Sequence, residues 1–297
     1  MAANYWLLTM NGLLIIDKPA GMTSHDVVAR ARRILQQRSV GHLGTLDPMA
    51  TGVLPIVAGN FTRLQQFFLH ADKEYEGEIR FGFATDTYDA EGEPATAPQQ
   101  INLKLEDLRK LSPTFVGDVD QAPPPFSAKK IGGVPAYKLA RKGHDPELKK
   151  VQVKVECFEI LSLDQDSARF HAHVSSGTYI RSLAHDLGQR AGTGAHLASL
   201  RRTRVGDFRI EDARTLEQFA AAPTAAFIHP RTLLADMPAV TATEQMVAFI
   251  RNGRAVNLPE MSRAKYVKVF LGQTELIAIA TRIAGTLFHA KVVLAGN

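Results

Sequence analysis

The stretch Gly41-His-Leu-Gly-Thr-Leu-Asp-Pro-Met-Ala-Thr-Gly52 decides how the rest of this sequence is interpreted. Its glycines permit backbone conformations that other residues resist, so we expect an ordered loop here. Asp47 precedes a proline, which disfavours helical geometry and helps to hold the Asp47 side chain outward from a turn. Because Asp-Pro pairs also commonly start turns, the loop alone leaves a catalytic carboxylate and an ordinary turn equally open.

Before this loop, the sequence predicts a short apolar strand at Leu13–Asp17 and then a helix. Thr23 or Ser24 is the expected N-cap, and the helix should end near Gly41. The apolar stripe of this helix repeats at helical spacing. It consists of Val27, Ala31, Ile34 and Leu35.

After the loop, alternating or apolar runs predict strands at Tyr75–Phe83, Val151–Leu161 and Phe170–Val174. Residues 121–150 contain Pro123-Pro-Pro125 and many basic residues, and they are expected to form an irregular insertion. A second helix follows from apolar residues at helical spacing. These are Ile180, Leu183, Ala184 and Leu187.

The residue pattern of the sequence changes near Met237. From there it predicts one short helix, Glu244–Arg251, and three short strands separated by glycine-containing turns. The strands are expected at Tyr266–Leu271, Glu275–Ala280 and Thr286–Leu294. We therefore expect two domains, residues 1–236 and a small β-rich domain of residues 237–297.

Composition bounds the possible functions. The 297 residues carry a formal net charge of +5, with a pI near 9.3, so an anionic partner is plausible. Residues 82–120 hold eight acidic residues against three basic ones, which concentrates positive charge elsewhere and favours a polyanion groove. The single cysteine, Cys157, excludes an internal disulfide. No secretory signal or membrane-length apolar run is present, so we expect a cytoplasmic protein.

The 41–52 loop resembles the catalytic motif of the TruB family of tRNA pseudouridine synthases. Leu43 stands where many members of that family carry Thr. Six further stretches resemble the same family in the same order along nearly the whole chain. They are Leu14-Ile-Ile-Asp-Lys-Pro-Ala-Gly21, Lys73-Glu-Tyr-Glu76, Thr85-Asp-Thr-Tyr-Asp89, Pro123-Pro-Pro-Phe-Ser-Ala128, Ser176-Gly-Thr-Tyr-Ile-Arg-Ser182 and Leu200-Arg-Arg-Thr-Arg-Val-Gly206.

The resemblance implies an α+β fold. Its catalytic domain would have a large mixed or antiparallel sheet flanked by helices, followed by a PUA-like RNA-binding domain. The implied reaction breaks the N1–C1′ bond of a uridine and rejoins the base through C5, here at position 55 in the T-arm of tRNA. This isomerisation requires no cofactor, and the sequence shows no phosphate-binding glycine motif. His171 and His173 could share a strand face but lack evident partner ligands, so we expect no metal.

The same resemblance makes Asp47 the nucleophile, acting either at C6 of the base or at the ribose. A carboxylate is already ionised at neutral pH and needs no adjacent base. Arg181 is expected to pair with Asp47, because a cation in the first turn of a helix is disfavoured unless an anion lies near. Tyr75 would stack on the flipped base and assist proton transfer.

Further site residues are carried over from the family. Tyr179 and Leu200 are expected to line the uridine pocket, although Leu200 lies in a segment that looks helical and would then default to the core. His42 matches the residue that contacts the RNA where the base is extruded. Lys18 and Pro19 are expected to support the catalytic loop.

Three other interpretations stay open. The chain could be a guide-RNA-dependent synthase, although its compact length and lack of charged tails favour a stand-alone monomer that needs no protein partner. It could be an RNA-binding or RNA-folding protein without catalysis. A glycoside hydrolase would need a second catalytic carboxylate, and none is evident in the motif loops.

Overall fold

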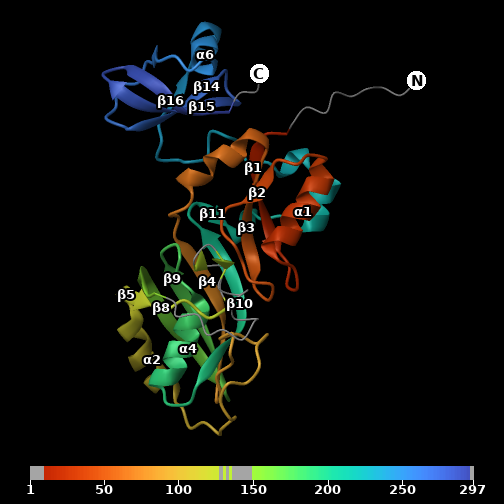
Figure 1. Ribbon diagram of the computed structural model, residues 1–297, viewed down its shortest axis with the longest axis vertical. Coiled ribbons are helices and arrows are strands. Elements are labelled where there is room, and N and C mark those ends of the chain that lie inside the picture. Colours follow the sequence, from red (N-terminus) through yellow and green to blue (C-terminus); the bar gives the residue numbers. More distant parts are fainter. Residues whose placement is uncertain (1–9, 127–129, 132–133, 136–148, 295–297) are drawn as a thin grey trace, which may run out of the picture.

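The structure is a computed structural model that describes residues 10–126, 130–131, 134–135 and 149–294. Figure 1 shows an elongated molecule with a large portion below and a small domain formed by the C-terminal part of the chain above. Among the described residues, no helix is both long and apolar enough to cross a membrane.

A mixed sheet organises the large portion. Among the described residues it has nine strands, in the order β1-β3-β10-β4-β9-β8-β5, with β2 beside β3 and β11 beside β10. Their bounds are β1 Gly12–Lys18, β2 Val40–His42, β3 Thr51–Ala58, β4 Lys73–Phe81, β5 Gly117–Gln121, β8 Val151–Asp164, β9 Ser167–Val174, β10 Ala195–Val205 and β11 Phe208–Arg209. Among these nine described strands, only β3 and β10 pair in parallel, at Arg201↔Thr51 and Arg202↔Gly52. This pairing joins the two halves of the sheet next to the 41–52 loop.

Helix α1 (Ser24–Leu35) covers the β1–β3 half of the sheet. Thr23 is its N-cap, and the side chains of Thr23 and Asp26 form a capping box, so the expected start is confirmed. The expected end near Gly41 is wrong. Gln36 adopts a left-handed conformation and ends the helix, because the chain must turn back to pair β2 with β3.

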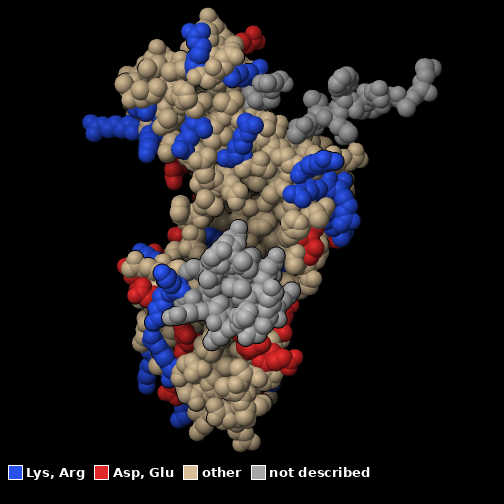
Figure 2. Space-filling view, viewed as in Figure 1, with Lys and Arg blue, Asp and Glu red and all other residues tan. Residues whose placement is uncertain are grey.

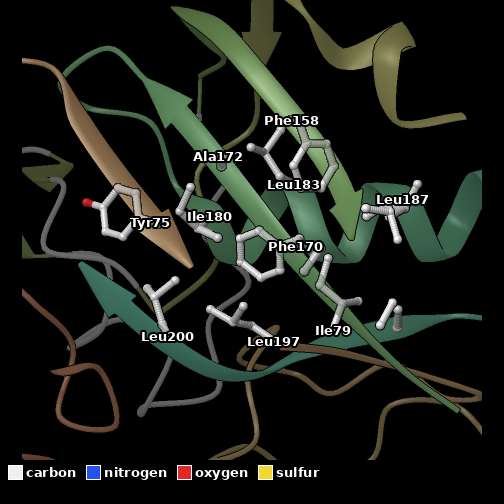
Figure 3. Close-up of a cluster of buried hydrophobic side chains, with 14 of the residues drawn as sticks. Tyr75, Ile79, Phe158, Phe170, Ala172, Ile180, Leu183, Leu187, Leu197 and Leu200 are labelled. Carbon is white, nitrogen blue, oxygen red and sulfur yellow. The ribbon is translucent and has the colours of Figure 1, made fainter. Parts of the chain in front are cut away.

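Helix α4 (Ile180–Arg190) confirms the second predicted helix and packs with α2 (Leu105–Leu111) on one face of the β4–β8 half. Figure 3 shows part of the buried cluster between α4 and the sheet, to which α4 contributes Leu183 and Leu187 and the sheet contributes Phe158 and Phe170. The segment around Leu200 is the central strand β10 and not a helix. Cross-strand pairing with β4 on one side and β3 on the other outweighs its local helical appearance.

The small domain is built on a second sheet. Among the described residues it contains five strands, β12-β14-β15-β16-β13, with α6 (Glu244–Arg251) beside them. The strand bounds are β12 Ala239–Thr241, β13 Val256–Asn257, β14 Tyr266–Leu271, β15 Glu275–Ala284 and β16 Leu287–Val293. The predicted helix and three predicted strands are therefore present. The α+β prediction is confirmed, with a large mixed sheet followed by a small β domain.

Shorter elements complete the large portion. The helix α5 (Leu216–Ala221) packs on β1, and the two-residue strands β6 (Lys130–Ile131) and β7 (Val134–Pro135) pair with each other. A nine-residue 3-10 helix, Gly59–Phe67, and three shorter ones connect the larger elements. The shorter ones are Ser112–Phe115, Ile210–Asp212 and Thr224–Ala226. Most of the predicted 121–150 insertion lies outside the described residues.

Candidate active site

The loop that carries Asp47 joins β2 to β3 and is fixed by contacts with the backbone. The Ser24 hydroxyl, at the start of α1, accepts a hydrogen bond from the Leu46 amide at 2.8 Å and lies 3.1 Å from the Leu46 carbonyl. The Ala50 amide donates to the Asp47 carbonyl at 3.1 Å, which closes a turn at Asp47-Pro48. The expected turn is therefore present, and the Asp47 side chain that it carries is 38% exposed.

Lys18 lies beneath this loop with no exposed surface. Its ammonium group donates to the carbonyl oxygens of Pro48 at 3.1 Å and Pro19 at 2.9 Å, and also to that of Met22. Burial lowers the pKa of Lys18 to about 8, and the nearby Asp47 charge opposes that change. Lys18 thus binds the loop directly, whereas Pro19 is exposed and contributes only its carbonyl group.

Arg202 holds the other side of the loop and is completely buried. Its guanidinium donates to the carbonyl oxygens of Val53 at 2.8 Å, Gly44 at 3.0 Å and Thr45 at 3.3 Å. Gly52 faces Arg202 across the parallel pairing, and a Cβ at Gly52 would lie 2.2 Å from the Arg202 carbonyl oxygen. Only glycine fits this close approach at a φ of +101°.

The expected Arg181–Asp47 ion pair is present. Nε of Arg181 lies 3.0 Å from Oδ2 of Asp47, and Nη2 lies 3.4 Å from Oδ1. Nη1 contacts a second carboxylate, Asp89, at 3.2 Å, and donates to the Thr87 carbonyl at 3.1 Å. Nη2 also donates to the Phe126 carbonyl at 3.0 Å. One buried guanidinium therefore connects Asp47 with Asp89.

The turn Thr85–Asp89 positions the second carboxylate. Oδ1 of Asp89 accepts from the Thr87 hydroxyl at 2.6 Å and the Glu91 amide at 3.0 Å, which leaves Oδ2 for Arg181. Burial raises the pKa of Asp47, Arg181 opposes the rise, and Asp89 adds to it. The charge of Arg181 thus works against burial to keep the Asp47 carboxyl ionised.

A cavity of about 470 Å³ opens beside Asp47 and has the size of a small-molecule site. Tyr75, Tyr179, Arg181 and Leu200 all line it, so the structure brings these predicted residues together. In Figure 3, Tyr75 and Leu200 lie at one end of the buried cluster, with the Tyr75 hydroxyl pointing away from it. The cavity therefore has an apolar, aromatic wall and a carboxylate–guanidinium edge.

His42 is not part of this cavity. It lines a neighbouring one of about 720 Å³, together with His25 and acidic residues of the segment 86–93. Burial lowers the pKa of His42, and its buried Nδ1 atom has no hydrogen-bond partner among the residues that the structure describes. Asp47 and Arg181 line both cavities, so the Asp47 loop separates them.

Sequence reasoning missed three residues of this site: Asp89, Arg202 and Lys73. Asp89 ends the quoted Thr85–Asp89 stretch, and Arg202 lies within the quoted Leu200–Gly206 stretch, so their motifs were available as signals. Lys73 also lines the 470 Å³ cavity, and burial lowers its pKa to about 8. Its ammonium donates to the Ala71 carbonyl at 2.6 Å.

The arrangement supports nucleophilic or electrostatic chemistry by a carboxylate on a planar substrate stacked against aromatic walls. In the described part of the chain, one group of side chains has the spacing to hold a metal, namely Cys157, Glu159 and His171. None of these three lines either cavity beside Asp47.

Known proteins resemble this chain along most of its length. A family model described as TruB family pseudouridylate synthase (N terminal domain) matches residues 32–180, and one described as tRNA pseudouridylate synthase B C-terminal domain matches residues 181–237. The chain is 45% identical to tRNA pseudouridine synthase B of Solibacter usitatus, over 96% of this chain and 100% of that protein. It is 40% identical to the protein of the same name from Aquifex aeolicus, again over 96% and 100%.

Solved structures agree with these sequence matches. A chain in the crystal structure of a Cbf5-Nop10-Gar1 complex has a TM-score of 0.71 and 27% identity, covering 96% of this chain and 85% of that one. A chain of an H/ACA RNP bound to a substrate RNA containing 2′-deoxyuridine has a TM-score of 0.69 and 25% identity over the same shares. The chain therefore belongs to the TruB family of tRNA pseudouridine synthases, isomerases that convert uridine to pseudouridine in tRNA.

Proposed function

We propose that the enzyme isomerises the T-loop uridine at position 55 of tRNA, with Asp47 as the nucleophile. One observation carries the assignment of Asp47. Its carboxylate is held by Arg181 at 3.0 Å and faces a cavity of about 470 Å³ with Tyr75 and Tyr179 in its wall. A flipped base loses its stacking neighbours, and the aromatic wall can replace them.

In the reaction the N1–C1′ bond breaks, a C5–C1′ bond forms, C5 loses its proton and N1 gains one. The isomerisation is redox-neutral and takes no atom from a cofactor. Asp47 acts either at C6 of the base or at the ribose, and Arg181 keeps its carboxylate anionic and oriented. Tyr75 stacks on the base, with its hydroxyl available for the proton that leaves C5.

The residues around Asp47 have supporting roles in this proposal. Tyr179 and Leu200 complete the wall of the uridine cavity. Lys18, with Pro19 accepting one of its hydrogen bonds, supports the loop from below. His42, in the neighbouring cavity, contacts the RNA from which the base is extruded. The two cavities would thus hold the flipped base and the strand that it leaves.

Basic side chains outside the site supply the contacts with phosphates. Figure 2 shows Lys and Arg over the C-terminal domain and over the region of α1. In the small domain they include Arg251, Arg254, Arg263 and Lys265, all exposed, and α1 adds Arg30 and Arg33. We assign residues 237–297 to RNA binding on this basis. Binding should then weaken steeply with salt, because bound cations are released from the RNA.

The stand-alone mode is favoured over guide-RNA dependence. The bacterial relatives match over their whole length at 40–45% identity, whereas the chains from the Cbf5 and H/ACA complexes match at 25–27%. An enzyme that resembles the first group more closely is expected to modify tRNA with no added RNA.

The test incubates the protein with an unmodified tRNA transcript and maps pseudouridine along it. Wild type should modify position 55, and Asp47→Asn should bind the transcript without modifying it. Asp166→Asn is the matched control, because Asp166 pairs with Arg80 on the exposed end of the sheet. Modification by Asp47→Asn would refute the nucleophile. Modification at another position, or only with added guide RNA, would refute the substrate or the stand-alone mode, and binding without modification by wild type would indicate a non-catalytic protein.

A further inference from the structure

The face of the sheet opposite α4 carries a row of side chains that the isomerisation does not use. On β9, Phe170 and Ala172 are buried in the cluster beneath the helices, so His171 between them projects from the other face. On β8, Phe158 is buried in the same cluster, and Cys157 and Glu159 on either side of it also project away. Strand alternation thus brings a thiol, a carboxyl and an imidazole to one surface.

Strand register brings these three groups together. Glu159 is the direct partner of His171, and Cys157 stands two residues along β8 on the same face. Sγ of Cys157 lies 3.9 Å from Nδ1 of His171, and one ligand atom from each of the three residues lies within 4.8 Å of the others. Two neighbouring strands of a continuous sheet hold the group, so its geometry is part of the fold.

The spacing is close to that of a tetrahedral zinc site. Zinc–sulfur and zinc–nitrogen bonds of about 2.3 and 2.0–2.1 Å place two tetrahedral ligands about 3.5 Å apart. Small side-chain rotations would therefore bring Cys157 and His171 from 3.9 Å to the bonding distance. Glu76 on β4 faces His171 from the other side, so the row across the sheet reads Glu76, His171, Glu159 and attracts a cation.

The neighbouring histidine is already engaged. Nε2 of His173 lies 3.1 Å from Nη2 of Arg204 and 3.6 Å from the Asp72 carboxylate. His171 has no such arginine contact among the interactions of the described residues, and its Nδ1 atom is directed at Cys157. The two histidines share a strand face, but only one of them stands in a set of metal ligands. The expectation that His171 lacks partner ligands is therefore wrong.

We propose that Cys157, Glu159 and His171 form a binding site for Zn²⁺ or a similar borderline-soft divalent cation, with water in the remaining position. Thiolate, imidazole and carboxylate are the ligand types that zinc takes in proteins. On binding, the Cys157 thiol gives its proton to solvent and a sulfur–metal bond forms. This proton must leave, because only the thiolate form of cysteine binds a metal. The inference does not depend on the proposed tRNA position.

The experiment uses the untagged, metal-free full chain and titrates it with Co²⁺ as a spectroscopic substitute for Zn²⁺. One equivalent should produce a thiolate-to-cobalt charge-transfer band in the near ultraviolet, and Zn²⁺ should abolish it by competition. Because Cys157 is the only cysteine in the chain, any such band reports on it. Cys157→Ser should abolish the band.

Two variants and a matched control separate this site from non-specific binding. Glu159→Gln and His171→Ala should each weaken Zn²⁺ binding by roughly 10-fold or more, since losing even an outer partner of a ligand costs about 10–100-fold. His173→Ala removes an imidazole from the same strand face and should leave the affinity unchanged. The absence of a cobalt band in wild type would overturn the proposal. So would unchanged Zn²⁺ affinity in Glu159→Gln, or equal losses in His171→Ala and His173→Ala. Circular dichroism verifies that each variant is folded.

Discussion

Replacing Arg181 by methionine should cost about 3–5 kcal/mol of the free energy of unfolding, because it leaves a buried carboxylate without its counter-ion. The Arg181 and Asp89 side chains are only 7% and 4% exposed, so their pair sets this magnitude. The Asp47 side chain is 38% exposed, so screening by water makes the contribution of the Arg181–Asp47 pair to this loss smaller. Methionine preserves most of the volume, which separates the loss of charge from the loss of packing.

Arg201→Met is the matched control. Arg201 and Asp17 also form a forked pair, at 3.1 and 2.8 Å, but their side chains are 42% and 28% exposed. Such a pair contributes at most about 1 kcal/mol. Urea titration followed by far-ultraviolet circular dichroism measures both variants. Equal losses for Arg181→Met and Arg201→Met would refute the reasoning from burial.

The loss in Arg181→Met should also depend on pH. Arg181 opposes the burial that raises the pKa of Asp47, so removing it raises that pKa further in the folded state. A carboxyl whose pKa in the folded state exceeds its unfolded value of about 3.9 stabilises the fold when it is protonated. The loss of stability in Arg181→Met is therefore complete above the folded-state pKa of Asp47 and becomes smaller as the pH falls. The difference from wild type should be smaller at about pH 5 than at about pH 7.5. A difference independent of pH would contradict this electrostatic explanation.

Three further outcomes are expected. In the dependence of kcat/KM on pH, the acid limb should lie above the ordinary pKa of aspartate. It should move to lower pH in Asp89→Asn, because the Asp89 charge raises the pKa of Asp47. A limb that does not move would contradict this effect of Asp89 on Asp47. Gly52→Ala should lower the free energy of unfolding by more than about 2 kcal/mol, and by more than Gly21→Ala does, as measured by urea titration. Both glycines have a positive φ, but of the two only Gly52 would bring a Cβ within 4 Å of other backbone atoms. Lys268→Met should lower the free energy of unfolding by about 1–3 kcal/mol, because the buried Leu233 carbonyl and the part-buried Arg231 carbonyl both lose their donor at 2.8 Å. The loss should appear as faster proteolysis near residues 231–234, and unchanged proteolysis would count against it.

Local patterns were sufficient for the elements whose stability is local. The capping box at Thr23, the apolar stripe of α4 and the helix Glu244–Arg251 follow from residues within a few positions of each other. Leu200 was misread as helical because the pairing partners of β10 lie more than a hundred residues away in the sequence. Element type therefore followed from sequence where short-range contacts dominate.

The candidate site likewise has a part that local motifs predicted and a part that depends on contacts between distant residues. The motifs identified Asp47, Tyr75, Tyr179 and Arg181, and the structure brings them to one cavity. Sequence could not show that Arg181 is shared with Asp89, because this contact spans 92 residues and depends on how one turn is oriented. The ligands around His171 were invisible for a related reason, since strand register across β8 and β9 sets their proximity.

The support of the Asp47 loop has a consequence for directed evolution of this enzyme. Arg202 binds the loop through the carbonyl groups of Gly44 and Thr45, and neither contact depends on the side chain of the loop residue. Thr45 is exposed and lines both cavities. A library of substitutions at position 45 would therefore vary the lining of both cavities while the loop keeps its shape, so substrate preference and fold can be selected separately.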